Sequence, residues 1–343
     1  MKILFYSSVS DISQFQTHGF YAEDIEILNS LNFEIVASNS LLDFVFLEYD
    51  ISFLYFYKKS LIPALISKIR GKKIYFTGGI DELSNNLEIN FINKFIFKFL
   101  FVINYFLSTA CNIVSKEDLF NVRKLLNTNR LINLDKLVYF PHSIDLLNYR
   151  ISQDILKENI IVSICWMNTI SNVKRKGVDK TLYLFIQIKK IYPEYKLYLV
   201  GSLGEGSDYL KKIIYDNSIV DSVIFTGIIE EKNKIALLSK SKFYFQLSNY
   251  EGFGIAVIEA MALNNFIFHT GVGGLKDTIS DKGYLIKDFI NFLDAMDYFK
   301  YLNRNYEDNR LKLELNNKYV FDNFSREIRS NYFKNLIFEH ENN

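Results

Sequence analysis

Two acidic residues and the glycines between them are the part of this sequence best suited to chemistry. Glu251 and Glu259 lie eight positions apart, with Gly252 and Gly254 between them. Glycines at such a turn let backbone N–H groups approach a ligand closely. The apolar run that follows, Ile255 to Leu263, predicts a helix whose positive end faces the turn. Such a helix end is a suitable seat for a phosphate group.

Glu259 is the one charged residue in that predicted helix. A carboxylate on an apolar helix is costly to bury unless it is hydrogen-bonded. One explanation is a structural ion pair or a favourable interaction with the helix dipole. If the helix starts near Gly254, Glu259 lies roughly 7 Å along it, and Glu251 lies just before its start. The two carboxylates would then flank the phosphate seat, which suits a ligand with a sugar at one end, a diphosphate in the middle and a ribose at the other.

This segment resembles the signature of family 4 retaining glycosyltransferases, which are GT-B enzymes that use nucleotide-sugar donors. The matching features are Glu-Gly-Phe-Gly-Ile, a second glutamate after seven intervening residues, Ala-Met-Ala, and the later Gly273-Gly274 pair. The resemblance implies that Glu259 binds the ribose hydroxyls and that Glu251 binds hydroxyls of the donor sugar. It also implies that the diphosphate site includes the backbone amides of Gly252, Phe253, Gly254 and Ile255.

A basic cluster in the second half could also bind a diphosphate. Lys174, Arg175 and Lys176 stand before Gly177, at the end of an expected polar loop and the start of an expected helix. Arginine offers a bidentate fork to phosphate, and lysine offers a point charge. The resemblance implies that Lys176 and an upstream arginine neutralise the leaving diphosphate. Trp166 occupies the usual place of that arginine, so Arg175 or Lys174 would substitute. The alternative is a solvated basic loop.

Other candidates follow predicted strands, where ligands of α/β folds bind. Gly201 lies in the glycine turn after one strand, and Thr226 and Gly227 end the next, which the resemblance places beside the nucleotide base. In the first half, Gly19 stands where relatives carry a Gly-Gly pair, so we expect it to contact the donor. Asp81 stands where relatives carry a histidine or aspartate near the reacting sugar or the acceptor, and it is a further catalytic candidate. A turn aspartate that caps the next helix is the alternative for Asp81.

The composition favours a globular protein of two domains. The chain has 343 residues, of which 49% are hydrophobic and 23% charged. Its formal net charge of +1 gives no reason to expect a nucleic-acid partner. Cys111 and Cys165 lie in apolar runs of different halves, which indicates two buried, reduced thiols in a cytosolic protein. The apolar stretch at residues 1–6 is too short for a signal peptide, and we therefore expect a cytoplasmic protein.

Short apolar runs, which we expect to be strands, alternate with helical stretches in both halves. This pattern is typical of an α/β protein with parallel sheets covered on both faces. The resemblance adds the GT-B architecture, in which two Rossmann-like domains face each other across a cleft. We expect an acceptor domain over residues 1–150, a nucleotide-sugar donor domain over residues 151–325, and a final helix over residues 326–343 that packs back on the first domain. The expected strands are 2–8, 33–37, 44–47, 51–56, 74–76, 110–114, 137–140, 160–165, 197–200, 223–227, 243–247 and 266–270.

Two segments of the first half suggest contact with a membrane surface. Tyr57–Lys73 carries six basic residues and no acidic one, and Phe91–Leu107 is crowded with Phe, Ile and Leu. A spanning helix needs about 20 apolar residues, and Ser108-Thr109 interrupts the run, so we expect no transmembrane segment. A basic, aromatic surface can lie on anionic lipid. The alternative is a core helix whose lysines reach solvent.

These features predict a retaining glycosyltransferase that moves a sugar from a UDP- or GDP-sugar to a glycan or lipid-linked acceptor. Family analogy suggests bacterial surface polysaccharide, lipopolysaccharide or glycoconjugate assembly, with peripheral contact at the cytoplasmic face of the inner membrane. No Asp-X-Asp element is placed for a metal, and we expect neither a metal nor a separate cofactor. Two alternatives stay open: a GT-B-type nucleotide-sugar epimerase, and a catalytically silent subunit that binds sugar nucleotides as a scaffold. A dehydrogenase is not expected, because no Gly-X-Gly-X-X-Gly follows the first strand.

Overall fold

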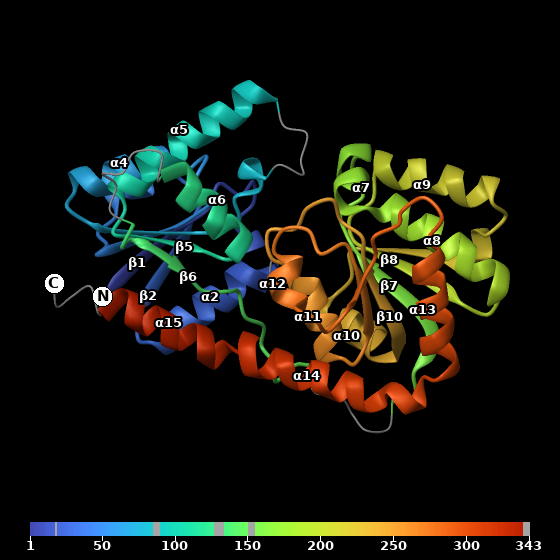
Figure 1. Cartoon of the computed structure of the whole chain (residues 1–343). Helices are drawn as coiled ribbons and strands as arrows, with labels where there is room; N and C mark the ends of the chain where they lie inside the picture. The colour runs from blue at the N-terminus through green and yellow to red at the C-terminus, as the bar shows by residue number, and fades with distance from the viewer. Residues whose placement is uncertain (18, 85–89, 127–133, 150–154, 339–343) are drawn as a thin grey trace. The chain divides into compact units, whose positions relative to one another are not determined.

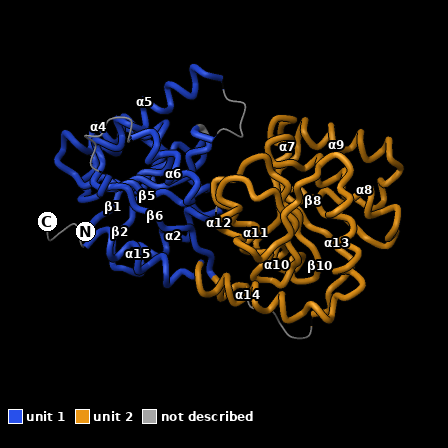
Figure 2. The backbone as a smooth tube through the Cα atoms, in the orientation of Figure 1, with its two compact units in different colours: residues 1–145, 324–343 blue, residues 146–323 orange. Residues whose placement is uncertain are grey.

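The chain forms two compact units in the computed structural model, which describes all residues except 18, 85–89, 127–133, 150–154 and 339–343. Unit 1 consists of residues 1–145 and 324–343, and unit 2 consists of residues 146–323 (Figure 2). The domain boundary expected between residues 150 and 151 lies outside the described residues.

Unit 1 is built on a six-stranded parallel sheet with the order β2-β1-β3-β4-β5-β6 (Figure 1). Its strands are β1 (Lys2–Tyr6), β2 (Glu34–Ser38), β3 (Ile51–Tyr55), β4 (Lys73–Thr77), β5 (Ala110–Ile113) and β6 (Leu137–Tyr139). Its helices are α1 (Gln14–Thr17), α2 (Gly19–Ser30), α3 (Asp43–Phe46), α4 (Leu61–Ile69), the 3-10 helix η1 (Asp81–Leu83), α5 (Phe91–Leu107), α6 (Lys116–Leu126) and α15 (Arg326–Phe338). Every residue of the internal strand β3 is buried, as a parallel sheet covered on both faces requires.

One expected strand of this half is wrong. The apolar run at residues 44–47 lies in the short helix α3 and its C-cap. Phe44 is fully buried, whereas Val45 and Phe46 are exposed. A single helical turn can bury one side chain of such a run and expose its neighbours. The run also lies between β2 and β3 in the chain, and β1 already pairs with both of these strands, so it leaves no free edge for a further strand there.

The last helix of the chain belongs to unit 1 through a buried ion pair. Arg329 of α15 donates to both carboxylate oxygens of Asp24 on α2, at 2.5 and 2.8 Å. The same guanidinium donates to the carbonyl of Pro141 and lies over the ring of Phe140. Tyr55 donates its hydroxyl to Asp24. These bonds satisfy a charged pair that is almost fully removed from water.

Unit 2 repeats the architecture with a second six-stranded parallel sheet of order β12-β11-β10-β7-β8-β9. Its strands are β7 (Glu158–Ile164), β8 (Lys196–Val200), β9 (Val223–Gly227), β10 (Ser241–Gln246), β11 (Phe266–His269) and β12 (Tyr284–Leu285). Its helices are α7 (Ile170–Lys176), α8 (Val178–Ile191), α9 (Glu205–Asp216), η2 (Val220–Ser222), α10 (Glu231–Lys240), α11 (Ile255–Ala262), α12 (Leu275–Ile279), α13 (Leu293–Arg304), η3 (Glu307–Asn309) and α14 (Arg310–Phe324).

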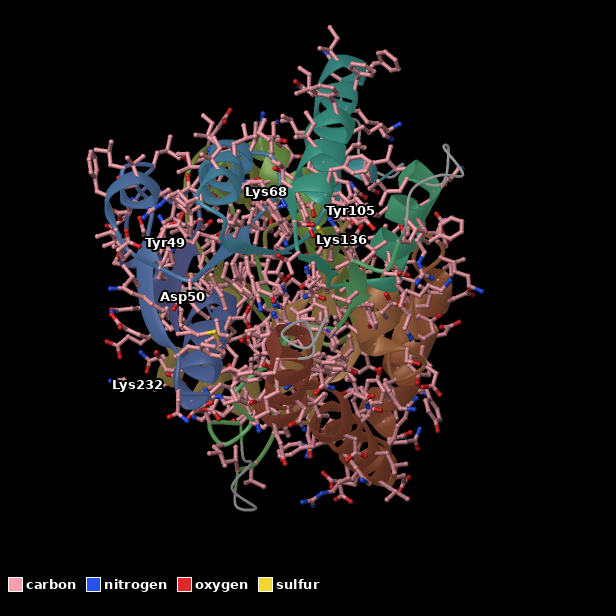
Figure 3. The ribbon with its side chains drawn as sticks, turned by 90° about the vertical axis from the view of Figure 1, so that its left-hand side faces the viewer. Tyr49, Asp50, Lys68, Tyr105, Lys136 and Lys232 are labelled. Carbon is pink, nitrogen blue, oxygen red and sulfur yellow. The ribbon has the colours of Figure 1, made fainter. Side chains whose placement is uncertain are left out.

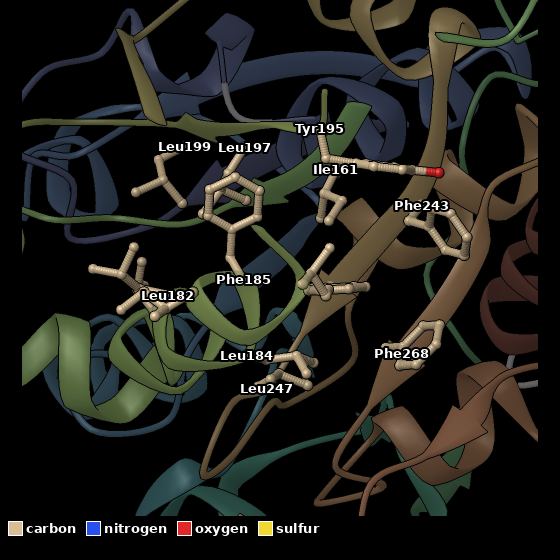
Figure 4. Close-up of a cluster of buried hydrophobic side chains, with 14 of the residues drawn as sticks. Ile161, Leu182, Leu184, Phe185, Tyr195, Leu197, Leu199, Phe243, Leu247 and Phe268 are labelled. Atoms are coloured by element: carbon tan, nitrogen blue, oxygen red, sulfur yellow. The ribbon is translucent and has the colours of Figure 1, made fainter. Parts of the chain in front are cut away.

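The core of unit 2 lies between its sheet and the helices that cover it. Leu182 and Phe185 of α8 pack beneath strand residues such as Ile161 and Leu197 (Figure 4). Phe243 belongs to the same cluster and lies at the centre of a group of aromatic rings. Because all six strands run in parallel, their carboxyl ends share one edge of the sheet, where the candidate residues of unit 2 are found.

Candidate functional site

Glu251 lies just beyond β10 in a buried, polar setting. Its exposed fraction is 7%. The Nζ of Lys176 lies 2.7 Å from Oε1 and 2.8 Å from Oε2. Gln246 and Ser248 also donate to Oε1, at 2.8 and 2.9 Å. The carboxylate is therefore held by one cation and two neutral donors, which is what a buried charge requires.

Lys176 reaches Glu251 because the loop after β10 caps the helix that carries it. The expected polar loop before Gly177 is instead α7, and the basic residues form its last turn. Asn249 donates its backbone N–H to the carbonyl of Arg175 and its side-chain amide to the carbonyl of Lys174, both at 2.8 Å. These bonds satisfy carbonyls that a helix end leaves unpaired, and cations are favoured at that end by the helix dipole.

At two glycines of this region, another segment of backbone passes so close that a side chain would not fit. Gly177 has a φ of +60°, and a Cβ there would lie 1.8 Å from the carbonyl oxygen of Leu247. Gly201 has a φ of +135°, and a Cβ there would lie 1.9 Å from the carbonyl oxygen of Cys165. The first crossing brings α7 against the loop that carries Glu251. The second packs the turn after β8 against the end of β7.

The tip of α11 lies next to Glu251 and is formed by the predicted glycine turn. Gly254 has a φ of +101° and precedes the first helical residue, Ile255. Phe253 is buried, and its carbonyl accepts a hydrogen bond of 2.6 Å from Thr278. The second glycine pair is packed on this turn, because the N–H of Gly274 donates to the carbonyl of Glu251 at 2.7 Å. The first amides of a helix have no intrahelical acceptor, so this tip can donate to an anion.

Glu259 lies within α11 and is also buried, with 6% of its surface exposed. Lys234 of α10 lies 2.8 Å from its Oε1. The structure therefore places both glutamates of the motif in unit 2, at either end of the first turns of α11, and gives each of them a lysine partner. Nothing near Lys234 in the sequence marks it as a partner of Glu259. The sequence did offer a signal for Gln246 and Ser248 as site residues, because they are alternate polar residues at the end of an apolar strand.

Gly201, Thr226 and Gly227 lie together at the ends of β8 and β9. The N–H of Gly201 donates to the carbonyl of Gly227 at 3.0 Å, and the hydroxyl of Thr226 donates to the same carbonyl at 2.8 Å. Sheet order places β7 between β10 and the two strands that carry this cluster. At a strand spacing of about 4.8 Å, the cluster lies roughly 10 to 14 Å along the edge from the end of β10.

The two candidates of the first half do not lie in unit 2. Gly19 and Asp81 lie in unit 1, where Gly19 begins α2 and Asp81 begins η1. Trp166, which occupies the expected arginine place after β7, is half exposed. His269 is buried at the end of β11, and burial lowers its pKa to about 4, so it is a neutral interior residue at pH 7.

The two cysteines are buried and free, and burial raises the pKa of each thiol to about 12. Thiols of this kind are inert at neutral pH. Among the described residues, no group of three or more His, Cys, Asp or Glu side chains is arranged to hold a metal ion.

Comparison with known families and proteins identifies relatives of this chain. Residues 167–319, less than half of the chain, match the family described as Glycosyl transferases group 1. The chain is 30% identical over 193 residues to a trehalose synthase of Thermococcus litoralis, which covers 50% of this chain and 45% of that protein. It is 33% identical over 90 residues to a GDP-mannose:cellobiosyl-diphosphopolyprenol alpha-mannosyltransferase of Xanthomonas oryzae pv. oryzae, which covers 25% and 23%. The chain thus spans less than half the length of these curated relatives.

The whole chain is similar in structure to HepE of Anabaena, solved in complex with UDP and glucose. The TM-score is 0.74 at 14% sequence identity, over 99% of this chain and 100% of HepE. This similarity confirms the predicted fold class, an α/β protein of the GT-B type with two parallel-sheet domains. The family match and the curated relatives support the prediction that the protein is a glycosyltransferase.

Proposed function

We propose that the protein is a retaining glycosyltransferase of family 4 that moves a sugar from a UDP- or GDP-sugar to a hydroxyl of a glycan or lipid-linked acceptor. One observation carries the proposal: Glu251, held by Lys176, and Glu259 flank the tip of a single helix in unit 2. A helix tip that offers backbone amides, with a lysine on the carboxylate before it, suits a diphosphate. The carboxylates on either side suit the hydroxyl groups of a sugar and of a ribose.

In this proposal each residue has a separate task. Glu259 accepts from the ribose hydroxyls, and Glu251 accepts from hydroxyls of the donor sugar. Lys176 and Arg175, with the amides from Gly252 to Ile255, stabilise charge on the diphosphate. Gly201, Thr226 and Gly227 lie beside the base. In unit 1, Gly19 contacts the donor, and Asp81 acts near the reacting sugar or the acceptor.

The chemical step needs no nucleophile from the protein. The acceptor oxygen forms a bond to the anomeric carbon on the face from which the diphosphate departs, and the bond from that carbon to the phosphate oxygen breaks. The departing phosphate oxygen takes the proton of the acceptor hydroxyl, so that a glycoside and a nucleoside diphosphate are formed. Lys176 and the helix tip stabilise the negative charge that grows on the leaving group, which is commonly the largest catalytic contribution.

Ligand-dependent thermal shifts test the donor class. A ligand at 100 times its Kd stabilises the folded state by about 2.7 kcal/mol, so UDP- and GDP-sugars should raise the Tm of the protein. ADP-sugars serve as the comparison. Transfer is then measured by NMR with the stabilising donor, and the product should keep the anomeric configuration of the donor. An inverted product would overturn the retaining mechanism.

The same assay separates the two alternatives. Epimerised or hydrolysed donor in the absence of any acceptor would favour the epimerase. Donor binding without turnover across a panel of glycan and lipid-linked acceptors would favour the scaffold subunit. The Glu251→Gln variant should bind the nucleotide and lose transfer, whereas Glu314→Gln, which changes an exposed glutamate of α14, should behave as wild type.

We further propose that unit 1 rests on the cytoplasmic face of the inner membrane, where it would meet a lipid-linked acceptor during assembly of a surface polysaccharide or other glycoconjugate. The mannosyltransferase relative is named for a diphosphopolyprenol acceptor. Within the described residues, no helix combines the length and the apolar character that crossing a bilayer requires. Any contact through these helices would therefore be peripheral.

Helix α5 supports this contact because it has two apolar faces. Phe97, Phe101 and Tyr105 are buried in the core of unit 1. On another face, large apolar side chains are exposed, and at 3.6 residues per turn they fall within an arc of about 140°. These residues are Phe91, Ile92, Phe95, Ile96, Phe99 and Phe106, with exposed fractions from 43% to 81%. A helix that only closes a core needs one apolar face, so the second face points to a partner.

The neighbouring helix α4 extends this surface and adds positive charge. Ile62, Leu65 and Ile69 are exposed on α4, which packs on α5, while Tyr57 at the start of the predicted segment is buried. Lys68 of α4 is also exposed and appears in Figure 3 with Lys136, which donates to the carbonyls of Phe106 and Ser108 at the end of α5. Neither predicted segment contains an acidic residue, so anionic lipid headgroups complement the charge.

Vesicle sedimentation tests this surface. The protein should bind vesicles that contain phosphatidylglycerol and bind neutral phosphatidylcholine vesicles less, with weaker binding at high salt. The double variant Phe95→Glu/Phe99→Glu should lose binding, and Leu311→Glu, at an exposed apolar position of α14, should retain it. Absence of vesicle binding, with a dimer in analytical ultracentrifugation that the double variant dissociates, would instead assign the surface to a second copy of the chain.

A further inference from the structure

Glu259 belongs to a polar network that joins α10 to α11. Lys234 lies between two carboxylates, 2.8 Å from Oε1 of Glu259 and 2.9 Å from Oε2 of Glu231. Tyr149, which is 3% exposed, donates its hydroxyl to Oε1 of Glu231. One lysine therefore connects two glutamates, and a tyrosine from a segment distant in sequence holds the second of them.

The network keeps a cation beside a buried Glu259, whereas the side chain of Glu231 is 57% exposed and reaches solvent. The side chain of Lys234 is 16% exposed and that of Glu259 is 7% exposed. Burial acts to lower the pKa of Lys234, but the charges of Glu259 and Glu231 outweigh it, so the pKa is raised above its usual value. Burial, followed by the same carboxylates, raises the pKa of Tyr149, which therefore stays protonated and donates.

Fold stability alone explains the network poorly. The residues on either side of Glu259 in α11, Ile258 and Ala260, are fully buried and apolar. Replacing a buried ion pair by apolar residues of similar volume is often neutral or stabilising, so such a pair is weak evidence for a role in stability. A carboxylate that must be presented to a ligand, in contrast, needs a fixed direction and a compensating charge.

We propose that Lys234 is a positioning residue that holds Glu259 in the orientation needed to accept both hydroxyls of the donor ribose. The inference rests on the proposed function, because it requires Glu259 to bind ribose. A carboxylate has about four lone-pair sites, so bonds to Lys234 and Tyr149 leave capacity for two hydroxyl groups. Glu231, which accepts from Tyr149, holds the lysine from the other side.

The network should therefore determine how strongly the site prefers a ribonucleotide to a 2′-deoxyribonucleotide. A site built to hydrogen-bond a hydroxyl rejects an analogue that lacks it, because the buried acceptor is left unpaired. Without Lys234, the carboxylate of Glu259 loses the contact that fixes its direction, so its oxygens no longer meet both ribose hydroxyls. The preference should then be lost together with the lysine.

Nucleotide binding to variants of the full chain tests this inference. The probe is UDP or GDP, whichever raises the Tm of the wild type more, together with its 2′-deoxy analogue. A hydrogen bond to a charged group contributes about 1.5–3 kcal/mol, which corresponds to a preference of roughly tenfold or more for the ribonucleotide in the wild type. Lys234→Met should lower that ratio to about one, and Lys234→Arg, which keeps the cation, should restore most of it.

Lys232→Met is the matched control, because Lys232 lies on the same helix in an exposed pair with Glu230 (Figure 3). It should leave the ratio unchanged. If Lys234→Met does not fold, Lys234→Gln is measured in its place. A Lys234 variant that loses Tm but keeps the wild-type ratio overturns the inference, because a purely structural role predicts that result.

Glu259→Gln separates this inference from the proposal on which it rests. If Glu259→Gln abolishes the ribose preference and Lys234→Met does not, the ribose assignment holds and the role of Lys234 is wrong. If the wild type binds the two nucleotides equally, or Glu259→Gln keeps the preference, the ribose assignment itself fails. Loss of the preference in both variants supports both.

Discussion

Lys176 contacts both carboxylate oxygens of Glu251, at 2.7 and 2.8 Å, although the two residues are 75 positions apart in the chain. The contact joins the end of α7 to the loop before α11. A lysine that already contacts the carboxylate proposed to bind the donor sugar needs little reorganisation to meet the proposed diphosphate. The Lys176–Glu251 pair thus links the residue proposed to stabilise the diphosphate with the residue proposed to bind the sugar.

Lys176→Met should remove catalysis more than stability. Loss of one preorganised charge contact at a transition state costs roughly 10²- to 10³-fold in rate, and kcat/KM should fall by about that factor. Gln246 and Ser248 still donate to Glu251, so the fold should persist. Steady-state kinetics and Tm are compared with those of Lys211→Met, which removes an exposed lysine of the same unit. A Lys176→Met enzyme within threefold of wild type would rule out the proposed role.

Gly177→Ala should disrupt the site, because the added Cβ would lie 1.8 Å from a backbone oxygen at residue 247. The backbone of α7 or of the loop after β10 would have to move, and Lys176 would move with it. Gly227→Ala is the matched control: its φ is +69°, but its Cβ would have no atom within 4 Å. It should cost only the left-handed strain of about 1–2 kcal/mol. Equal losses of Tm in the two variants would contradict the crossing argument.

His269 should make unit 2 less stable in acid. Burial lowers its pKa to about 4 from a usual value near 6.5, so between these pH values the unfolded chain binds more protons than the folded one. The stability is fully present above pH 6.5 and falls by about 3 kcal/mol as the pH drops to 4.

In His269→Leu this contribution to the pH dependence should disappear, as measured by urea denaturation at pH 6.5, 5 and 4. Burial also lowers the pKa of His142 in unit 1, so the difference between variant and wild type is the quantity to compare. A difference that does not change with pH would show that His269 titrates normally in the folded protein.

Asp24→Ala should destabilise unit 1 by about 3–5 kcal/mol, because it leaves Arg329 buried without its carboxylate. Both side chains are 1% exposed. The control is Glu34→Gln, which breaks a pair between Lys2 and Glu34 on the surface of the same unit and should cost less than about 1 kcal/mol. If chemical denaturation gives similar losses of unfolding free energy for Asp24→Ala and Glu34→Gln, the buried pair does not hold α15 in place.

The sequence predicted the elements that depend on local pattern. Strands such as Lys196–Val200 and the glycine turn before α11 follow from apolar runs and from glycine positions, and the structure contains both. The strand prediction failed at residues 44–47, where a four-residue apolar run is equally compatible with a helical turn. The loop predicted before Gly177 is a helix, which Thr169 caps at its start and Gly177 ends in the left-handed conformation.

Only the part of the site that depends on local sequence could be predicted. Glu251 and Glu259 stand in one local motif, so their spacing could be interpreted without knowledge of the fold. Their lysine partners could not be found in this way, because Lys176 and Lys234 reach them from other helices, 75 and 25 positions away. Such pairs are set by tertiary packing and leave no periodic signal in the chain.

The central claim is that Glu251 and Glu259 bind opposite ends of one donor, and calorimetric titration of two ligands tests it most directly. The ligands are the nucleotide sugar selected by the thermal shifts and the free nucleoside diphosphate derived from it. Glu251→Gln should weaken binding of the nucleotide sugar and leave the affinity for the free diphosphate unchanged, whereas Glu259→Gln should weaken both. If the two variants weaken the two ligands alike, or if Glu251→Gln binds the nucleotide sugar as the wild type does, the claim is contradicted.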